Sequence, residues 1–518
     1  MEGLENMAFV ANAVSLFTYF YGYMNFSITK SATTLTNFMG TAFLLSLFGG
    51  FLSDTYLSRF TTCVLFGTFE ILGYVLLTVQ ARVHQLRPTP CNGAAALSGG
   101  SQCEAATGGQ SATLYIGLYL IALGTSGVKA ALPSLGADQF DSRNPKEAGK
   151  LSSFFNWFLF SLTVGAIVGV TIVVWVSANV GWDWGFGLCG LAVLCAVVFV
   201  SMGKSLYRMN APSGSPFVRF AQVFVAAIRN WNVPTPKAND LESPTNLNPW
   251  RLCTTTQVEE TKILIRMLPI ILSTVFMNTC LAQLQTFTIQ QSTTMDRNFL
   301  GFQIPGPSIP VIPLLFMFLL IPLYDRVFVP LARRFTGIPT GIRHLQRIGI
   351  GLVLSAVSMA VAGIVETKRK RVAVEHGMVD SVAPLPYSVF WLGFQYSIFG
   401  AADMFTLVGL LEFFYSESSA GMKALSTAIS WTSLAFGYFL STVVVEVVNK
   451  VSGGWLESNN LNRDKLNYFY WLLSALSVVN LGAYLLCASW YRYKEVEVVV
   501  AAREGDGREK RVGEFVGV

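Results

Sequence analysis

The sequence contains few charged residues and very few histidines. Only 13% of its 518 residues are Asp, Glu, Lys or Arg, about half the fraction usual in a soluble domain, whereas 52% are hydrophobic. The three histidines, His84, His344 and His376, each lie in or beside an expected loop. No nucleophile is paired with a base in the apolar segments. These shortages argue against a soluble protein and against an enzyme.

Paired cysteine motifs are also missing. The eight cysteines are scattered singly, and no two have the Cys-x-x-Cys spacing of a redox or zinc site, so we expect no metal and no other cofactor. Cys91 and Cys103 share one long loop and could form a disulfide there or remain reduced. The N-terminus has no basic region ahead of its apolar run and no small-residue cleavage site, so we expect no removable signal peptide.

Long apolar runs dominate the sequence instead. A run of about 20 apolar residues can cross a bilayer as a helix, because lipid offers no partner for backbone polar groups. Such runs occupy 5–23, 37–52, 61–81, 112–132, 152–175, 184–202, 263–283, 309–329, 348–365, 387–414, 424–448 and 468–491. The sequence therefore predicts an all-α integral membrane fold of about twelve transmembrane helices. This spacing predicts a six-helix bundle at 1–202, a linker at 203–261, a second six-helix bundle at 262–491 and a tail at 492–518.

The loop charges orient this array in the membrane. Lys and Arg are more numerous in the loops that share a side with both termini, which predicts cytoplasmic termini, linker and tail. The net charge of +6 then indicates contact with the inner leaflet and not with nucleic acid. The run from Lys368 to Arg371 falls on the opposite side, where we expect a solvated loop. Within the linker, Pro216 followed by an apolar stripe at helical spacing predicts an amphipathic helix at the membrane surface.

Two loops at equivalent places in the two halves carry similar charges. Asp54 and Arg59 lie between the second and third runs, and Asp325 and Arg326 lie near the end of the eighth run, ahead of the ninth. Such a repeat resembles the major facilitator architecture, in which two halves rock about a central site, and it predicts gating loops at these residues. The alternative is that short charged loops simply favour Asp and Arg.

The ionisable residues that we single out are Glu70, Lys129, Asp403 and Glu412 within the predicted helices, and Glu2 and Glu5 at the start of the first one. A charge in the membrane needs a partner, a water-filled cavity or a function. We expect Lys129 to form an ion pair across the two halves with Glu412 or Asp403, so that protonation of the carboxylate releases a gate. A static pair that only fixes helix packing is the alternative. For Glu70 and Asp403 we favour a structural role.

Several motifs resemble one transporter family in the right order along the chain. They are Gly136–Asp141, Phe154–Phe158, Thr294–Arg297, Tyr324–Arg326, Leu345–Gly349 and Leu411–Phe414. Together they resemble the proton-coupled oligopeptide transporter family, and more narrowly its plant nitrate and peptide transporter branch. The resemblance implies a major facilitator fold, alternating access and uptake driven by a proton gradient at the plasma membrane. It places Lys129 on the family's fourth-span lysine and Glu412 on its tenth-span glutamate.

The start of the chain departs from the family pattern. Glu2 and Glu5 match the first-span Glu-x-x-Glu-Arg element, but Asn6 replaces the arginine that would lower the proton affinity of the glutamates. Proton coupling would then depend on Lys129 and Glu412, or transport would run downhill. Family members also have about two helical turns before the first glutamate, so we expect either a shortened form or a missing initial segment.

The expected substrate cavity is less polar than in typical members. Leu281 replaces the histidine of nitrate carriers, Leu159 and Thr163 replace a tyrosine and an asparagine, and Val10 replaces a tyrosine. With Lys129 and Gln283 they form a predicted cavity with one buried cation. Segments 6–9 and 36–40 resemble the subgroup that carries abscisic acid and gibberellins. We therefore expect a small organic anion, with nitrate as the alternative substrate, and protons and the lipid bilayer as the other partners. A membrane sensor with little net flux and a proton-independent facilitator remain as alternatives.

Overall fold

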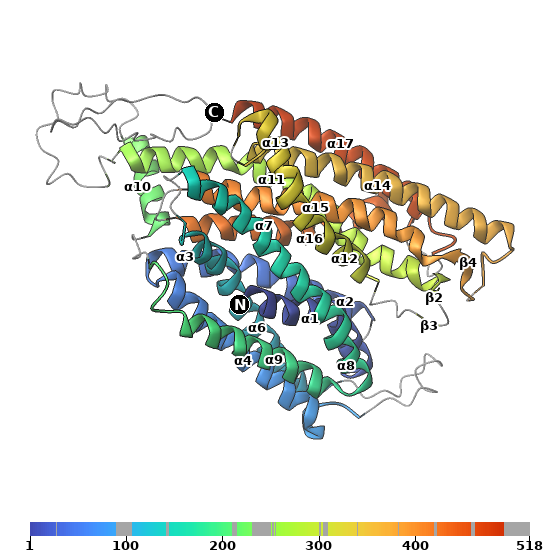
Figure 1. Ribbon diagram of the computed structural model, residues 1–518. Coiled ribbons are helices and arrows are strands. Elements are labelled where there is room, and N and C mark those ends of the chain that lie inside the picture. Colours follow the sequence, from blue (N-terminus) through green and yellow to red (C-terminus); the bar gives the residue numbers. More distant parts are fainter. Residues whose placement is uncertain are drawn as a thin grey trace, which may run out of the picture.

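The computed structural model describes residues 1–491 with gaps. The gaps are 27, 90–105, 141–144, 210–214, 230–249, 251–252, 254, 300–301, 304–308, 339, 382, 419–421 and 457–460. The expected tail at 492–518 and the possible Cys91–Cys103 disulfide lie outside the described residues. In Figure 1 most helices of the N-terminal half, coloured blue to green, lie in the lower part of the view, and the helices of the C-terminal half, coloured light green to red, lie in the upper part.

The N-terminal half is helical throughout its described part. Its helices are α1 (Glu2–Gly22), α2 (Ile28–Leu44), α3 (Ser46–Thr55), α4 (Arg59–Arg82), α6 (Gly108–Ala137), α7 (Pro145–Val168), α8 (Val174–Asn179) and α9 (Trp182–Met202). A π-helical turn, η2 (Gly169–Val173), joins α7 to α8, and a short 3-10 turn, η1 (His84–Leu86), follows α4. α2 and α3 together make one membrane span, and so do α7 and α8.

The C-terminal half repeats this plan with longer helices. They are α11 (Thr255–Thr293), α12 (Val311–Leu323), η5 (Tyr324–Phe328), α13 (Val329–Thr336), α14 (His344–Glu375), η6 (Val389–Trp391), α15 (Leu392–Glu417), α16 (Lys423–Ser452) and α17 (Leu466–Trp490). Two small sheets cap one end (Figure 1). In them β1 (Met295–Asp296) pairs with β4 (Leu385–Ser388), and β2 (Asn298–Phe299) pairs with β3 (Phe302–Gln303).

Eleven helical stretches within the described ranges are long and apolar enough to cross a membrane. α1 is not among them, although it has 21 residues, because Glu2, Glu5, Asn6 and Asn12 lower its hydropathy. It nevertheless packs inside the N-terminal half against α7 and α9. With α1 counted, six spans lie on each side of the linker, so the prediction of an all-α fold with about twelve transmembrane helices in two bundles is confirmed.

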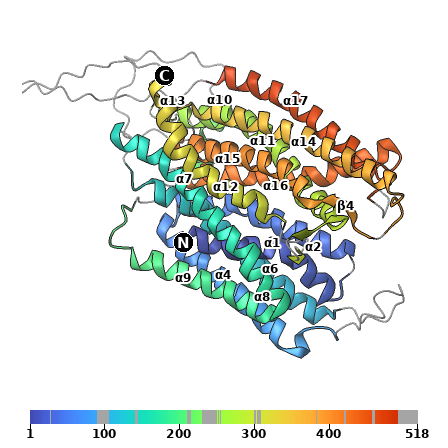
Figure 2. The same cartoon turned by 45° about the vertical axis from the view of Figure 1, so that its right-hand side comes forward.

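The linker contains a helix where the apolar stripe predicted one. This helix, α10 (Pro216–Arg229), contacts both α3 and α11 at one end of the molecule (Figures 1 and 2). Gln257 of α11 donates a hydrogen bond to Gln222 of α10 at 3.5 Å. The linker helix therefore touches both halves at the end where the polar contacts described below are concentrated.

The two halves meet through two groups of helices, one around α16 and one around α7. α16 packs on α2, α3 and α6, while α7 packs on α12 and α15 (Figure 2). Small residues allow the closest approach, since a Cβ atom at Gly50 would lie 2.9 Å from the Ala428 Cβ atom and the Ala424 carbonyl oxygen. Close crossings of this kind need residues without bulky side chains.

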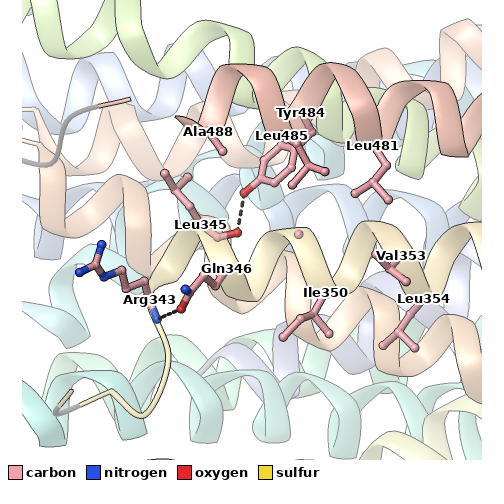
Figure 3. A pocket seen from close by; sticks show the side chains of 11 residues that line it. Arg343, Leu345, Gln346, Ile350, Val353, Leu354, Leu481, Tyr484, Leu485 and Ala488 are labelled. Atoms are coloured by element: carbon pink, nitrogen blue, oxygen red, sulfur yellow. Dashed lines mark hydrogen bonds between the residues drawn. The ribbon is translucent and has the colours of Figure 1, made fainter. Parts of the chain in front are cut away.

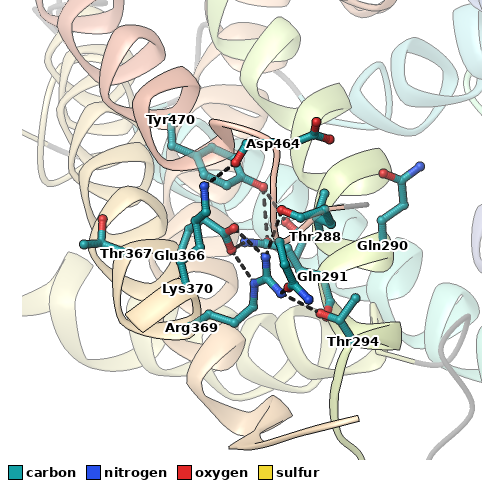
Figure 4. A network of polar contacts seen from close by, with 12 residues as sticks. Thr288, Gln290, Gln291, Thr294, Glu366, Thr367, Arg369, Lys370, Asp464 and Tyr470 are labelled. Carbon is teal, nitrogen blue, oxygen red and sulfur yellow. Dashed lines mark hydrogen bonds and ion pairs between the residues drawn. The ribbon is translucent and has the colours of Figure 1, made fainter. Parts of the chain in front are cut away.

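The prediction of a solvated loop at Lys368–Arg371 was wrong. α14 continues through this run, and the Arg369 side chain is fully buried. Its guanidinium donates two hydrogen bonds of 2.7 Å to Glu366 and others to Thr294 and Asn462 (Figure 4). The error arose because a bidentate partner one turn earlier neutralises the charge, which allows an arginine to be buried. Lys368 and Arg371 are exposed, as expected.

Candidate substrate and proton site

Lys129 lies deep in the N-terminal half on α6. Its side chain is only 2% exposed, because Gly124 and Gly127 let α6 approach α4 closely. The ammonium Nζ atom is 3.0 Å from Glu5 Oε2, 3.9 Å from Glu2 Oε1 and 3.4 Å from Asn6 Oδ1. The α1 residues noted in the sequence therefore surround the α6 lysine.

The expected ion pair between Lys129 and Glu412 is not formed. Glu412 on α15 instead lies 3.5 Å from Arg347 Nη1 and 3.6 Å from His344 Nδ1, both at the start of α14. Lys129 and Glu412 each pair within their own half, Lys129 with Glu5 and Glu412 with Arg347. Asp403, the other expected partner, is only partly buried and forms no ion pair with any described residue.

An aromatic wall from both halves encloses the lysine. Nζ of Lys129 lies 4.9 Å from the centre of the Phe9 ring and 5.3 Å from that of Trp431, a residue of α16. The Trp431 indole donates a 3.1 Å hydrogen bond to the Lys129 carbonyl and stacks on Phe43 at 6.0 Å. The buried cation therefore lies at the boundary between the halves, where cation–π contacts add to its stabilisation.

The residues predicted to line the cavity do not all face the same space. The Thr163 hydroxyl donates to the Leu159 carbonyl at 2.9 Å within α7, and both side chains are buried. Gln283 was misplaced: it is buried between α11 and α16, where its amide donates to Ser441 Oγ at 2.7 Å. Val10 and Leu281 are partly exposed. Gln283 thus packs within the C-terminal half and is unavailable to a substrate in this conformation.

A second glutamine on α11 is the polar residue that the sequence reasoning missed. Gln285 is exposed, and its side-chain oxygen accepts a 2.6 Å hydrogen bond from the Tyr438 hydroxyl of α16. Tyr438 also stacks on Phe43 of the N-terminal half at 6.4 Å. Helical spacing was the available signal, because Gln285 follows Leu281 by one turn and shares its face, whereas Gln283 does not.

Polar contacts between the halves are concentrated at the end carrying α3, α10 and α13, which we call the gate face. There Asp54 accepts a 2.8 Å hydrogen bond from the Leu425 backbone N–H and pairs with Arg59 at 3.4 Å. Arg59 also forms an ion pair with Asp138, and Asp138 accepts a 2.7 Å hydrogen bond from the Tyr415 hydroxyl. Two acidic residues of the N-terminal half thus bind the C-terminal half.

The C-terminal half makes the corresponding contacts. Asp325 accepts hydrogen bonds from Ser153 at 2.9 Å, Asn156 at 2.8 Å and Trp157 at 3.0 Å, all on α7. Arg347 donates to the Asn156 side-chain oxygen at 2.7 Å, and the Arg326 guanidinium lies 5.3 Å from the centre of the Trp157 indole ring. Asp325 and Arg326 lie in the helical segment η5 and not in the predicted loop, but both charged pairs contact the opposite half at the gate face.

A groove of about 570 Å³ lies elsewhere, between α14 and α17 (Figure 3). Its walls are mainly aliphatic side chains such as Ile350, Val353 and Leu481, and the Tyr484 hydroxyl in it donates to the Leu345 carbonyl at 2.6 Å. Every lining residue belongs to the C-terminal half. This groove therefore does not contain Lys129 or any other predicted cavity residue.

Comparisons with known proteins agree with the motifs. The POT family profile matches residues 60–461. Protein NRT1/ PTR FAMILY 4.5 of Arabidopsis thaliana is 44% identical over 526 residues, covering 95% of this chain and 92% of that relative. Protein NRT1/ PTR FAMILY 4.6 of the same plant is 42% identical over 549 residues, covering 95% and 93%.

Solved structures of similar fold are also transporters. One is an auto-inhibited POT family peptide transporter, with a TM-score of 0.65 at 18% identity over 95% of this chain and 96% of that one. Another is a POT family transporter in complex with 5-aminolevulinic acid, with a TM-score of 0.61 at 12% identity over 94% of each chain. Identities this low show the fold alone, whereas the profile and the curated relatives show the family. The chain is a multi-pass membrane transporter, not an enzyme, and belongs to the POT family, as its motifs predicted.

Proposed function

We propose that this protein is a proton-coupled transporter of small organic anions, such as abscisic acid or gibberellin, that works by alternating access. The observation that carries this proposal is the buried Lys129–Glu5 pair at 3.0 Å, next to Trp431 of the other half. We further propose that it lies in the plasma membrane with both termini and the gate face on the cytoplasmic side, in agreement with the loop charges.

The Lys129–Glu5 pair suggests how an anion and a proton travel together. While Glu5 is ionised it neutralises Lys129, so an entering carboxylate would meet no free cation. Protonation of Glu5 releases the lysine for the substrate anion, because a buried ammonium without a counter-ion is strongly disfavoured. One proton therefore accompanies each anion, and the transfer conserves the charge of the site.

Glu412 supplies a second proton-sensitive contact, at the gate face. It neutralises Arg347, which also binds Asn156 of α7, and the Ser152 hydroxyl of α7 faces the same carboxylate. Protonation of Glu412 would leave Arg347 without its counter-ion and weaken the contact between α14 and α7. Opening of the gate face would follow, as the equilibrium shifts to the conformation in which the arginine is solvated.

The surroundings of Lys129 favour an organic acid with an apolar body. The rings of Phe9, Phe43 and Trp431 provide apolar surface near the cation, and Leu281 offers no hydrogen-bond donor where nitrate carriers have a histidine. Pockets for such ligands are mainly apolar with a few placed polar groups. Nitrate, which has no apolar surface, would gain little from these rings.

Uptake into proteoliposomes tests this proposal. Abscisic acid, a gibberellin and nitrate would be compared under an imposed proton gradient, for the unaltered protein, Lys129→Ala and Glu412→Ala. We expect saturable uptake of an organic acid, a loss of at least tenfold in both variants, and no change in the control Lys262→Ala, whose lysine is half exposed at the start of α11. Near-normal uptake in both variants, or no organic-acid uptake by the unaltered protein, would contradict it.

A further inference from the structure

Glu70 is a buried carboxylic acid that the proposed mechanism does not yet use. It lies in the interior of α4, its side chain has no solvent exposure, and neither oxygen meets a hydrogen-bond donor at good geometry among the described residues. The hydroxyl of Thr125 on α6 is a neighbouring polar group. A carboxylate buried without donors is costly, so this residue needs either a proton or a cation.

Helix packing directs Glu70 toward the lysine site. α4 and α6 are in such close contact that a Cβ atom at Gly124 would lie 2.4 Å from the Glu70 Cβ atom. Thr125 follows directly, and Lys129 lies one helical turn after Thr125. The ionisable groups that interact with Glu70 come from α1, α4, α6 and α9: Glu2, Glu5, Tyr74, Lys129 and Cys189.

The charges in this cluster do not balance. Glu2, Glu5 and Glu70 are three acids around one ammonium group, and the Met1 amino group adds a positive charge only beside Glu2. Whether or not that amine is counted, the acids outnumber the cations. Since uncompensated charge is disfavoured in a buried site, at least one acid is neutral. Glu5 and Glu2 lie 3.0 and 3.9 Å from Lys129, whereas Glu70 has neither a hydrogen-bond donor nor an ion pair among the described residues, so a proton belongs on Glu70.

We propose that Glu70 is a second proton-binding site of the Lys129 cluster, protonated in this gate-closed conformation. The idea rests on the proposed function, in which a proton on Glu5 accompanies the substrate. A second acid adds one proton to that scheme. When the anion leaves Lys129 and water enters the cluster, Glu70 can lose its proton to the same side as Glu5, because both acids adjoin the same ammonium group. The cluster then moves two protons per anion where Glu5 alone would move one.

Infrared spectroscopy of the purified protein in lipid nanodiscs tests for this proton without transport. A buried protonated carboxyl group gives a C=O band that ionised carboxylates lack. We expect this band at neutral pH in the unaltered protein, its loss in Glu70→Gln, and a shifted band in Glu70→Asp. Glu366→Gln is the matched control, because Glu366 is equally buried but bound twice by Arg369 and therefore ionised. This control should leave the band unchanged.

Transport supplies the second measurement. If the unaltered protein moves an organic anion, Glu70→Gln should still bind it, and the protons moved per anion should fall from about two to about one. A band that persists in Glu70→Gln, or that is absent from the unaltered protein, overturns the assignment of the proton whatever the transport result. If the unaltered protein shows the band but no uptake, the proposed function fails and the proton site stands. Glu70→Asp shows whether loss of the band reflects the missing carboxyl group or a misfolded variant.

Discussion

Lys129 in the N-terminal half and Arg347 in the C-terminal half are buried cations that make similar kinds of contact. Lys129 pairs with Glu5 of its own half. Its ammonium group also lies over the ring of Trp431 of the other half, and its backbone carbonyl accepts a hydrogen bond from the Trp431 indole. Arg347 pairs with Glu412 of its own half and binds Asn156 of the other half. In each case a proton on the carboxylate would free a cation that adjoins the interface. Coupling therefore needs no ion pair that crosses the interface.

The sequence identified these ionisable residues but not their partners. An ionisable residue in an apolar run can be recognised from composition alone, because its desolvation cost requires an explanation. Which carboxylate lies nearest to each cation depends on how the helices are arranged in three dimensions. The spacing of residues along the chain does not show this arrangement. Glu5 is 124 residues from Lys129, and Asn156 is 191 residues from Arg347. Arg347 and Asn156 were visible only as members of family motifs.

We predict that Leu281→His improves nitrate uptake. Leu281 is partly exposed and one turn before Gln285, so a histidine there could donate a hydrogen bond to an anion beside an existing polar group. A hydrogen bond to a charged group contributes about 1.5–3 kcal/mol, so the apparent affinity for nitrate should rise tenfold or more. Uptake of labelled nitrate would be compared with that of Leu281→Phe, which adds a ring but no donor. Strong saturable nitrate uptake by the unaltered protein would refute the premise.

At the scale of helices, the positions of the spans were predictable and their ends were not. The run at 348–365 correctly placed the centre of α14, but the helix extends from His344 to Glu375. Hydrophobicity marks only the part of a helix that must lie in lipid. The part of the helix beyond the apolar run depends on side-chain contacts. At the end of α14 opposite the gate face, Glu366 neutralises Arg369, and Asn462 accepts a hydrogen bond from it. For the same reason α1 could be recognised only approximately, since its polar residues face the protein interior.

We predict that Arg369→Leu destabilises the C-terminal half. The substitution leaves Glu366 fully buried without its cation, which costs about 3–5 kcal/mol in comparable ion pairs. It also removes the contacts with Thr294 and Asn462 that join α14 to its neighbours (Figure 4). Thermal unfolding of the detergent-solubilised protein should show a clearly lower midpoint. Arg371→Leu, at an exposed position two residues later, should leave the midpoint nearly unchanged, and equal effects of the two variants would contradict the importance of burial.

At the scale of the whole molecule, the gate face has an approximate twofold repeat. Asp54 ends the second span and binds the start of α16, while Asp325 follows α12 in the eighth span and binds the middle of α7. Arg59 and Arg347 begin equivalent helices, and each pairs with an acid at the end of the next span, Asp138 and Glu412. The sequence predicted charged residues at matching places in the two halves, and in the structure Asp54 and Asp325 each bind the opposite half, although Asp325 lies in the helical segment η5 and not in a loop.

We predict that Asp325→Asn shifts the protein toward a conformation open at the gate face. The carboxylate accepts three hydrogen bonds from α7, and losing its charge should weaken the closed state by about 1.5–3 kcal/mol, a tenfold or larger change in population. Spin labels at Tyr56 and Phe335, both exposed, would report the distance between the halves after replacement of accessible native cysteines. Asp380→Asn, in an exposed pair with Arg463, serves as the control. An unchanged distance distribution in Asp325→Asn would show that these bonds do not hold the gate.

The cations near Glu5 should determine how steeply the complete transport cycle depends on a proton gradient. Asn6 is held by a 2.8 Å hydrogen bond from its amide to the Leu162 carbonyl of α7, and its oxygen lies 3.4 Å from Lys129 Nζ. It therefore contributes a dipole where relatives have an arginine. Glu5 then has one nearby cation, and its proton affinity should change less between the outward-open and inward-open conformations than with two.

We accordingly expect a shallower dependence on external pH than in relatives with the full Glu-x-x-Glu-Arg element, and a steeper one in Asn6→Arg. Uptake would be measured in proteoliposomes at several imposed pH gradients, with a neutral or permanently charged analogue so that the substrate itself does not titrate. Asn6→Gln keeps the amide and should behave like the unaltered protein. A steep dependence that Asn6→Arg leaves unchanged would mean that the proton affinity is set elsewhere in the cluster, and the three acids around Lys129 make Glu70 the first residue to examine.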